Sequence, residues 1–97
     1  MKFISYSKPS HRISTRRKEW RMKTKVKDLR VAAGLTQQQL ADAVHVSART
    51  IISIEKEQYK PSLMLAYRMA QLFRTTIEDL CCLEENQRKE DEEYGKI

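Results

Sequence analysis

The chain has 97 residues, of which 40% are hydrophobic and 33% are charged, with 19 Lys and Arg against 13 Asp and Glu. A chain of this length forms one small core with little room for a substrate cavity, which argues against most enzyme folds. Its apolar runs fall far short of the roughly 18 residues that span a bilayer, so we expect no membrane partner.

Positive charge is concentrated at the N-terminus. Residues 1–21 hold seven basic residues and one acidic residue, whereas residues 22–83 hold nine and six, and residues 84–97 hold three and six. These differences divide the chain into a basic N-terminal extension (1–21), a folded domain (22–83) and an acidic C-terminal tail (84–97). Basic segments bind nucleic-acid phosphates by releasing counterions, so the extension is a candidate DNA contact; the alternative is a solvated lead-in. The tail has the composition of a solvated, disordered end.

The two cysteines, Cys81 and Cys82, are adjacent. Neighbouring cysteines rarely reach disulfide geometry, and the two histidines do not complete the spacing of a zinc site. We therefore expect no disulfide framework, no metal and no cofactor. The N-terminus lacks the apolar block of a secretory signal, so a cytoplasmic location is expected.

From residue 23 to residue 83 the apolar residues recur at helical spacing, which predicts an all-α core. The first helix should end at Gly34, because glycine readily adopts the left-handed conformation that stops a helix. The second begins at Thr36, which forms a T-x-x-Q capping box with Gln39, and ends near His45. The apolar stripe of the first helix consists of Met22, Val26, Leu29 and Ala33.

Three further helices follow. Ser47 caps a third helix that ends near Lys56 and turns Ile51 and Ile54 inward. Ser62 caps a fourth, and a short fifth begins at Thr76. The inner stripe of the fourth helix is Leu65, Ala66, Met69, Leu72 and Phe73. The same spacing favours a core or dimer-surface position over a ligand site for Met64, Met69 and Tyr67.

The second and third helices are joined by about three residues, as in a helix-turn-helix, which holds its second helix in the DNA major groove. The motifs G-L-T-Q-x-x-L-A, V-S-x-x-T-I-x-x-I-E, Y-x-P-S and I-E-D-L occur in this order. Over residues 23–83 the chain therefore resembles the Cro and phage-repressor type of helix-turn-helix transcriptional regulators, the xenobiotic-response-element group. The resemblance implies a compact five-helix, lambda-repressor-like domain that binds a two-fold symmetric operator as a dimer, in a bacterium, phage or mobile element.

Three positions depart from the family pattern. His45, Glu57 and Arg74 stand where such sequences commonly carry glycine with a positive φ. That conformation costs other residues about 1 kcal/mol, so we expect either a less stable domain or a shifted local geometry.

The resemblance suggests that Gln37 binds a backbone phosphate; a solvated position is the alternative. Because Ile51 and Ile54 turn inward, the third helix should present Arg49 for two hydrogen bonds to a guanine, and Ala48 and Ile52 for contact with thymine methyl groups. Packing against the first helix is the alternative for Ile52. Glu55 should anchor the scaffold, since a carboxylate would repel phosphates. The candidate DNA-binding residues are Gln37, Ser47, Ala48, Arg49, Thr50, Ile52, Ser53, Lys56 and Lys60.

No catalytic motif or glycine-rich phosphate loop occurs, so we do not expect an enzyme. The sequence favours a dimeric repressor that binds double-stranded DNA, with subunit contact through the last helix and residues 80–83. One alternative is an antitoxin that binds a toxin protein and represses its own operon. Another is a bridging factor, whose helical core binds a protein while its basic extension binds DNA.

Overall fold

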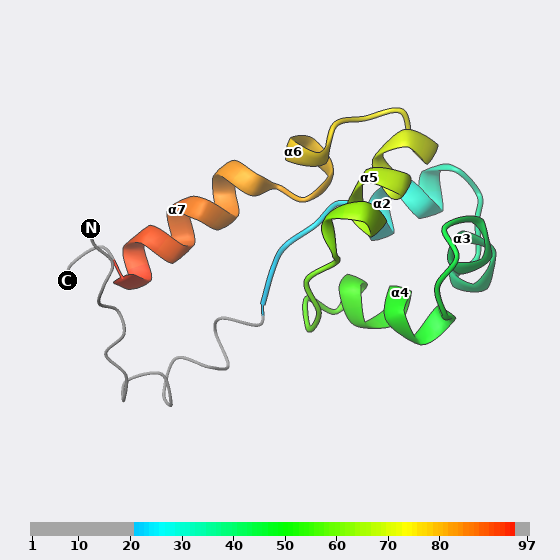
Figure 1. Ribbon diagram of the computed structural model, residues 1–97, viewed down its shortest axis with the longest axis horizontal. Coiled ribbons are helices and arrows are strands. Elements are labelled where there is room, and N and C mark those ends of the chain that lie inside the picture. Colours follow the sequence, from blue (N-terminus) through cyan, green and yellow to red (C-terminus); the bar gives the residue numbers. More distant parts are fainter. Residues whose placement is uncertain (1–20, 95–97) are drawn as a thin grey trace.

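The computed structural model describes residues 21–94, and over this range it contains helices but no strand. Its six helices are α2 (Val26–Ala32), α3 (Gln37–Ala43), α4 (Ala48–Glu55), α5 (Leu63–Leu72), α6 (Ile77–Leu80) and α7 (Leu83–Tyr94). Helices α2 to α6 gather into a bundle, and α7 extends away from it (Figure 1). The all-α prediction is confirmed, with one helix more than the five expected. Apart from Arg21, the predicted basic extension lies outside the described residues.

Hydroxyl side chains start four of the helices, as the sequence predicts. The Thr36 hydroxyl oxygen accepts a hydrogen bond from the Gln39 backbone N–H at 3.0 Å, and the Gln39 side-chain oxygen accepts one from the Thr36 N–H at 2.9 Å. This reciprocal pair confirms the capping box at the start of α3. Ser47, Ser62 and Thr76 accept the corresponding hydrogen bonds at α4, α5 and α6. Each cap satisfies a backbone donor that the helix leaves unpaired.

Left-handed residues follow the helices. Gly34 has a φ of 75°, and His45, Glu57 and Arg74 have φ values of 66°, 63° and 58°. The backbone has therefore kept the conformation usually given to glycine, and the alternative of a shifted local geometry is wrong. Cys82, between α6 and α7, has a φ of 48° and is a fourth non-glycine residue with this conformation in the described range. Sequence reasoning did not identify this turn.

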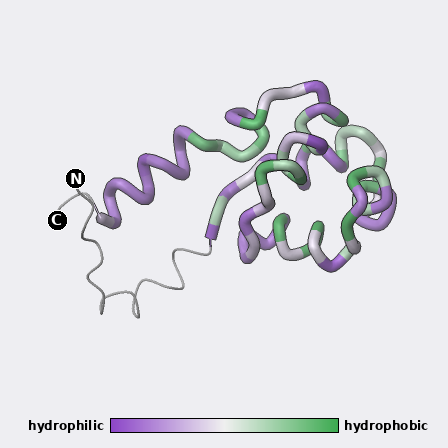
Figure 2. The backbone as a smooth tube through the Cα atoms, viewed as in Figure 1, coloured by the Kyte–Doolittle hydropathy of each residue, from purple (hydrophilic) through white to green (hydrophobic). Residues whose placement is uncertain are grey.

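The core is made of side chains from α2 to α6. They are Val26, Leu40, Ala41, Val44, Ile51, Ile54, Leu65, Ala66, Met69, Ala70, Leu80 and Cys81. Hydropathy along the backbone separates this apolar bundle from the hydrophilic α7 (Figure 2). Three details of the predicted stripes are wrong. Ala33, placed on the stripe of the first helix, is exposed just beyond the end of α2. Leu72 is exposed and Ala70 is buried in its stead, and Met22 packs against the core from the segment before α2 rather than from a helix.

Residues 83–94 form a helix, so the expectation of a disordered tail is wrong for this part of the chain. The Asn86 side-chain amide donates to the backbone oxygens of Lys23 at 2.9 Å and Cys81 at 2.7 Å, and its oxygen accepts from the Lys23 N–H at 3.1 Å. The Lys25 N–H donates to the Leu80 carbonyl oxygen at 2.8 Å. These hydrogen bonds join the segment before α2 to the end of α6 and the start of α7. Within the described range, none of the helices has the length and apolar character that crossing a membrane requires.

Candidate nucleic-acid interface

Helices α3 and α4 pack against each other across the short turn formed by residues 44–47. Val44 is buried in this turn, and the Val46 N–H donates to the Ala41 carbonyl oxygen at 3.0 Å. His45 supplies the left-handed step that reverses the chain before Ser47 caps α4. The turn therefore fixes the direction of α4 relative to α3, which is the geometry of a helix-turn-helix.

Helix α4 has an apolar inner face and a polar outer face. Ile51 and Ile54 are fully buried, as predicted. On the opposite side Arg49 and Lys56 are exposed, with Ser53 partly exposed between them. In the part of the chain that the structure describes, no hydrogen bond or ion pair engages the Arg49 guanidinium group. Its five N–H donors can therefore reach a base edge without first leaving a protein partner.

Other predicted residues of α4 are less open. Ala48 is partly buried and packs against the core, so the prediction that it faces fully outward is wrong. The Ser47 and Thr50 hydroxyl oxygens lie 3.2 Å apart, and Ser47 also accepts from the Thr50 N–H. These two residues build the start of α4, and any DNA contact they make would come from hydroxyl groups already used in the cap.

A largely shielded ion pair joins α2 and α4 behind this outer face. Arg30 Nε donates to Glu55 Oε2 at 2.6 Å and Arg30 Nη2 to Glu55 Oε1 at 3.2 Å, while Nη1 donates to the Leu35 carbonyl oxygen at 2.8 Å. The hydrogen bond and the charge of Glu55 raise the pKa of Arg30 above its ordinary value, against the opposing effect of burial. The two side chains are only 12% and 5% exposed. The prediction that Glu55 anchors the scaffold is confirmed.

The same carboxylate holds Gln37, whose Nε2 donates to Glu55 Oε1 at 3.0 Å. The Gln37 side chain is therefore held by a protein partner and is not simply solvated. Its amide has a second N–H and an oxygen that can still reach a phosphate, and the ion pair fixes where they lie.

A shallow hollow of about 560 Å³ lies between α2, the start of α3 and α4. Gln37, Lys56 and Ile52 line it, so Ile52 turns toward α2 and α3 and is not freely exposed. Lys27 lines it as well, and sequence reasoning missed this residue because the pattern of α2 alone does not show which of its polar side chains faces α4. Two lysines beside one hollow provide the positive charge that a backbone phosphate would neutralise.

Lys60 lies in the loop after α4, close to α7. The Gln58 N–H donates to the Ser53 carbonyl oxygen at 2.9 Å and so ties the start of this loop to α4. The Lys60 ammonium lies 3.6 Å from Glu90 Oε2, and its side chain is 43% exposed. The loop thus brings Lys60 near the C-terminal end of α4, but its ammonium already has an acidic neighbour.

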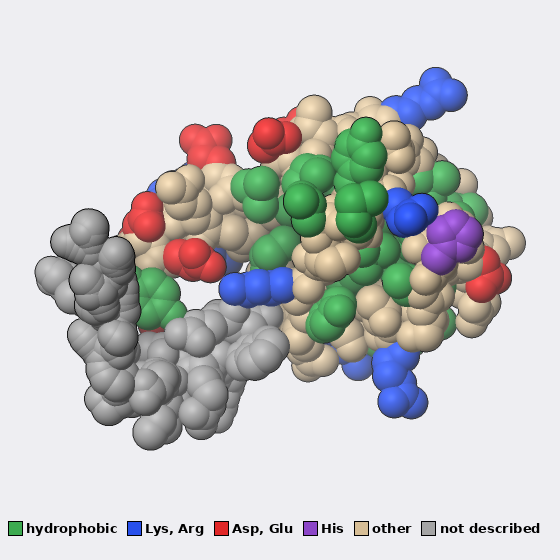
Figure 3. Space-filling view, in the orientation of Figure 1, with side chains coloured by type: hydrophobic (Ala, Val, Ile, Leu, Met, Phe, Trp, Pro, Cys, Tyr) green, Lys and Arg blue, Asp and Glu red, His purple; other side chains and the backbone are tan. Residues whose placement is uncertain are grey.

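Helix α5 carries an unpartnered apolar surface. Leu63 is 71% exposed, Met64 56% and Tyr67 48%; we call these three residues the α5 apolar face. Hydrophobic side chains gather over α5 and α6 in the space-filling view (Figure 3). Of the residues expected in the core or on a dimer surface, Met69 is buried in the core, whereas Met64 and Tyr67 are exposed, so a core position is wrong for these two and a dimer surface stays a prediction. Part of the predicted subunit contact at residues 80–83 is wrong, because Leu80 and Cys81 are buried inside the domain and only Leu83 there is well exposed.

The two cysteines are free thiols. Burial raises the pKa of the Cys81 thiol, and the neighbouring Cys82 raises it further. Among residues 21–94 no group of three or more His, Cys, Asp or Glu side chains could hold a metal ion.

A helix-turn-helix family model matches residues 26–80, which begin with α2 and end with α6. The chain belongs to this Cro/C1-type helix-turn-helix family. Its helix-turn-helix domain is similar to an uncharacterized HTH-type transcriptional regulator of Archaeoglobus fulgidus, with 46% identity over 59 residues, 61% of this chain and 84% of the relative. An uncharacterized HTH-type transcriptional regulator of Methanothermobacter thermautotrophicus is 46% identical over 69 residues, 70% of this chain and 100% of the relative. YgzD of Bacillus subtilis is 44% identical over 64 residues, 66% of this chain and 97% of the relative.

Proposed function

We propose that this protein is a sequence-specific regulator of transcription that binds double-stranded DNA with α4 in the major groove. The observation that carries the proposal is the outer face of α4. Arg49 and Lys56 are exposed there, opposite the buried Ile51 and Ile54, at the position of the second helix of a helix-turn-helix. A helix with one polar face of this kind fits the width of the major groove, where every base pair presents a distinct set of donors and acceptors.

Within this proposal the residues divide into base contacts and backbone contacts. Arg49 donates two hydrogen bonds to a guanine, and Ile52 offers its remaining exposed surface to a thymine methyl group. Backbone phosphates are bound beside them by lysines and amides that surround α4, and these contacts fix the register of the protein on the duplex. The backbone-binding side chains are Lys27, Gln37, Lys56 and Lys60.

We further propose that the protein acts as a homodimeric repressor in the cytoplasm and has no enzymatic activity. The α5 apolar face supports the dimer, because three large apolar side chains on one exposed helix favour burial against a second copy. A two-fold axis that places the two α4 helices about 34 Å apart would let them enter successive major grooves. Repression would then follow from occlusion of the polymerase at an operator.

The test is selection of duplexes from a random pool by the full chain at about 150 mM salt, where phosphate contacts alone bind weakly. Recovery of a two-fold symmetric motif is the expected result. Recovery of no motif by the folded protein would contradict the proposal. It would favour a protein partner, as an antitoxin or a bridging factor has, and a pulldown would then separate those two roles.

A further inference from the structure

Helix α7 is an acidic addition to the helix-turn-helix domain. It begins at Leu83, beyond residues 26–80 that match the family, and none of its residues is buried. It carries six acidic and two basic side chains, for a net charge of −4. A helix with this charge opposes the binding of a polyanion wherever it lies near the contact surface.

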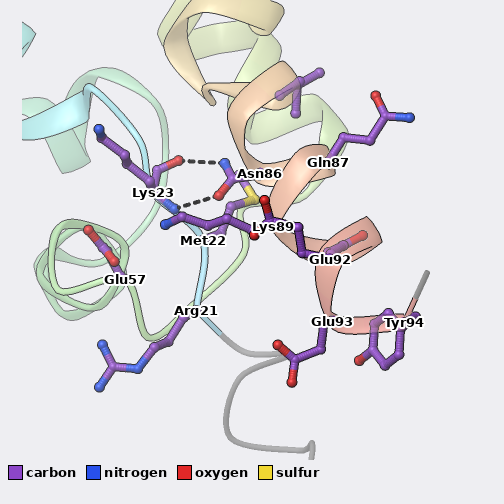
Figure 4. A pocket seen from close by; sticks show the side chains of 12 residues that line it. Arg21, Met22, Lys23, Glu57, Asn86, Gln87, Lys89, Glu92, Glu93 and Tyr94 are labelled. Atoms are coloured by element: carbon purple, nitrogen blue, oxygen red, sulfur yellow. Dashed lines mark hydrogen bonds between the residues drawn. The ribbon is translucent and has the colours of Figure 1, made fainter. Parts of the chain in front are cut away.

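The start of α7 is fixed to the body of the domain. The Asn86 side chain accepts a hydrogen bond from the Lys23 backbone N–H and donates one to the Lys23 carbonyl oxygen. Lys23 Nζ also lies 3.2 Å from Glu85 Oε2. Figure 4 shows Asn86 and Lys23 facing each other across the space between α7 and the segment before α2. These contacts involve backbone as well as side-chain atoms and all lie in the first half of α7. They therefore fix the direction in which the whole helix leaves the domain.

The second half of α7 faces the loop that follows α4. A cleft of about 710 Å³ lies here, and Glu57 from the loop lines it together with Glu92 from α7 (Figure 4). Glu90 lines it as well, and so do the basic residues Arg21, Lys23 and Lys89. Glu90 Oε2 also lies 3.6 Å from the ammonium of Lys60. A helix outside the family match therefore forms an ion pair with Lys60, a cation that the proposed function assigns to a backbone phosphate.

We propose that α7 is a built-in competitor for DNA, in which Glu90 holds Lys60 until a backbone phosphate replaces it. The inference rests on the proposed function, because Lys60 must contact phosphate. When the Lys60 ammonium approaches a phosphate, the Glu90 carboxylate bound to it is repelled by the negative charge of that phosphate. Glu90 therefore has to separate from Lys60 when DNA binds. The affinity of the full chain for any duplex is thereby lower than that of the same domain without Glu90.

The experiment compares the full chain with its Glu90→Gln variant on a random-sequence duplex, by fluorescence anisotropy at about 50 mM salt, where phosphate contacts alone bind measurably. We expect the variant to bind about two- to fivefold more tightly, the range that an exposed ion pair provides. Asp91→Asn is the matched control, since it removes the same charge from the next residue of the exposed helix, and Asp91 forms no ion pair with Lys60 within residues 21–94. Glutamine has nearly the helix propensity of glutamate, so α7 stays folded, and Glu90→Ala provides a second variant with the same expected gain.

Lys60→Ala completes the test. In that background Glu90→Gln should bring no gain beyond that of Asp91→Asn, because the cation that Glu90 holds is gone. Equal gains from Glu90→Gln and Asp91→Asn in the parent chain would overturn the inference, and so would a gain from Glu90→Gln that survives Lys60→Ala. Failure of the proposed function has a different signature: the parent chain would not bind duplex DNA at all.

Discussion

Glu55 is the side chain on which α2, α3 and α4 meet. Its two oxygens accept hydrogen bonds from Arg30 and Gln37, and it is 5% exposed. Removing its charge leaves the Arg30 guanidinium largely buried without a counterion. We expect Glu55→Gln to lower the free energy of unfolding by about 2–4 kcal/mol, measured by urea denaturation. Glu78→Gln, which removes an exposed carboxylate from α6, should change it by less than about 0.5 kcal/mol; equal effects would contradict the anchoring role.

Arg49 is the residue whose replacement should change sequence preference. We expect Arg49→Ala to weaken binding to the selected operator by about 1–3 kcal/mol and to relax the preference at one base pair, because alanine cannot donate the two hydrogen bonds to guanine. The measurement is competition between the operator and its single-base variants. Arg68→Ala removes a comparable exposed guanidinium from α5 and should leave the preference unchanged. A uniform weakening on operator and random DNA would mean that Arg49 binds the backbone.

Cys81 links stability to alkaline pH. Burial raises the pKa of its thiol on folding, so between the unfolded and folded pKa values the folded state holds a proton that the unfolded state has lost. The stabilisation is fully present below the pKa of the unfolded thiol, about 8.5, and decreases as pH rises through the higher pKa of the folded thiol. We therefore expect the loss of stability between pH 8 and 10 to be smaller in Cys81→Ala than in the parent chain. An unchanged slope would contradict this assignment.

At the scale of the element, the helix ends carry a cost that can be removed. His45 has a φ of 66° between α3 and α4, a conformation that glycine adopts with less strain. We expect His45→Gly to stabilise the domain by about 0.5–1 kcal/mol, seen as a melting temperature several degrees higher. Gly34→Ala is the opposite control: its added Cβ meets nothing within 4 Å, so the φ of 75° alone should make it destabilising by about 1 kcal/mol. An unchanged or lower melting temperature for His45→Gly would refute the prediction.

The elements that could be predicted are those that local chemistry determines. Thr36 and Ser47 cap helices whose hydrogen bonds close within three residues, so the helix-turn-helix follows from the sequence. The buried positions of α4 follow from helical spacing in the same way. Helix α7 could not be predicted from its acidic composition, because Asn86 holds its start through hydrogen bonds to Lys23, 63 residues away in the chain.

The side chains whose burial was predicted wrongly also depend on contacts between segments that are distant in the sequence. Leu72 fits the apolar stripe of α5 by spacing, yet the neighbouring helices bury Ala70 and leave Leu72 exposed. Ile52 and Lys27 meet at one hollow only because α2 packs next to α4. The helical period predicts which residues share a face, but the partner of that face depends on how the helices pack, and packing is not encoded locally.

For the whole molecule, charge is arranged in three zones. Residues 1–20 contain six basic residues and one acidic residue, the helix-turn-helix domain is weakly basic, and α7 carries a net charge of −4. DNA therefore meets a domain flanked by segments of opposite sign. Among the residues that the structure describes, the buried core residues lie between Val26 and Cys81.

Deletion of residues 1–20 tests whether this basic segment contributes to DNA binding, to stability or to neither. If the segment binds phosphates, the logarithm of the binding constant should depend less steeply on the logarithm of salt concentration, by about 0.9 for each phosphate that is no longer neutralised. The free energy of unfolding should change little, since Arg21 and Met22 remain to complete the packing against the domain. Replacing the six basic residues with glutamine in the full chain is the control, and it should reproduce the flatter slope if charge is the cause. A slope and an affinity unchanged by both variants would show that the basic segment takes no part in binding, and that the affinity for DNA belongs to the helix-turn-helix domain alone.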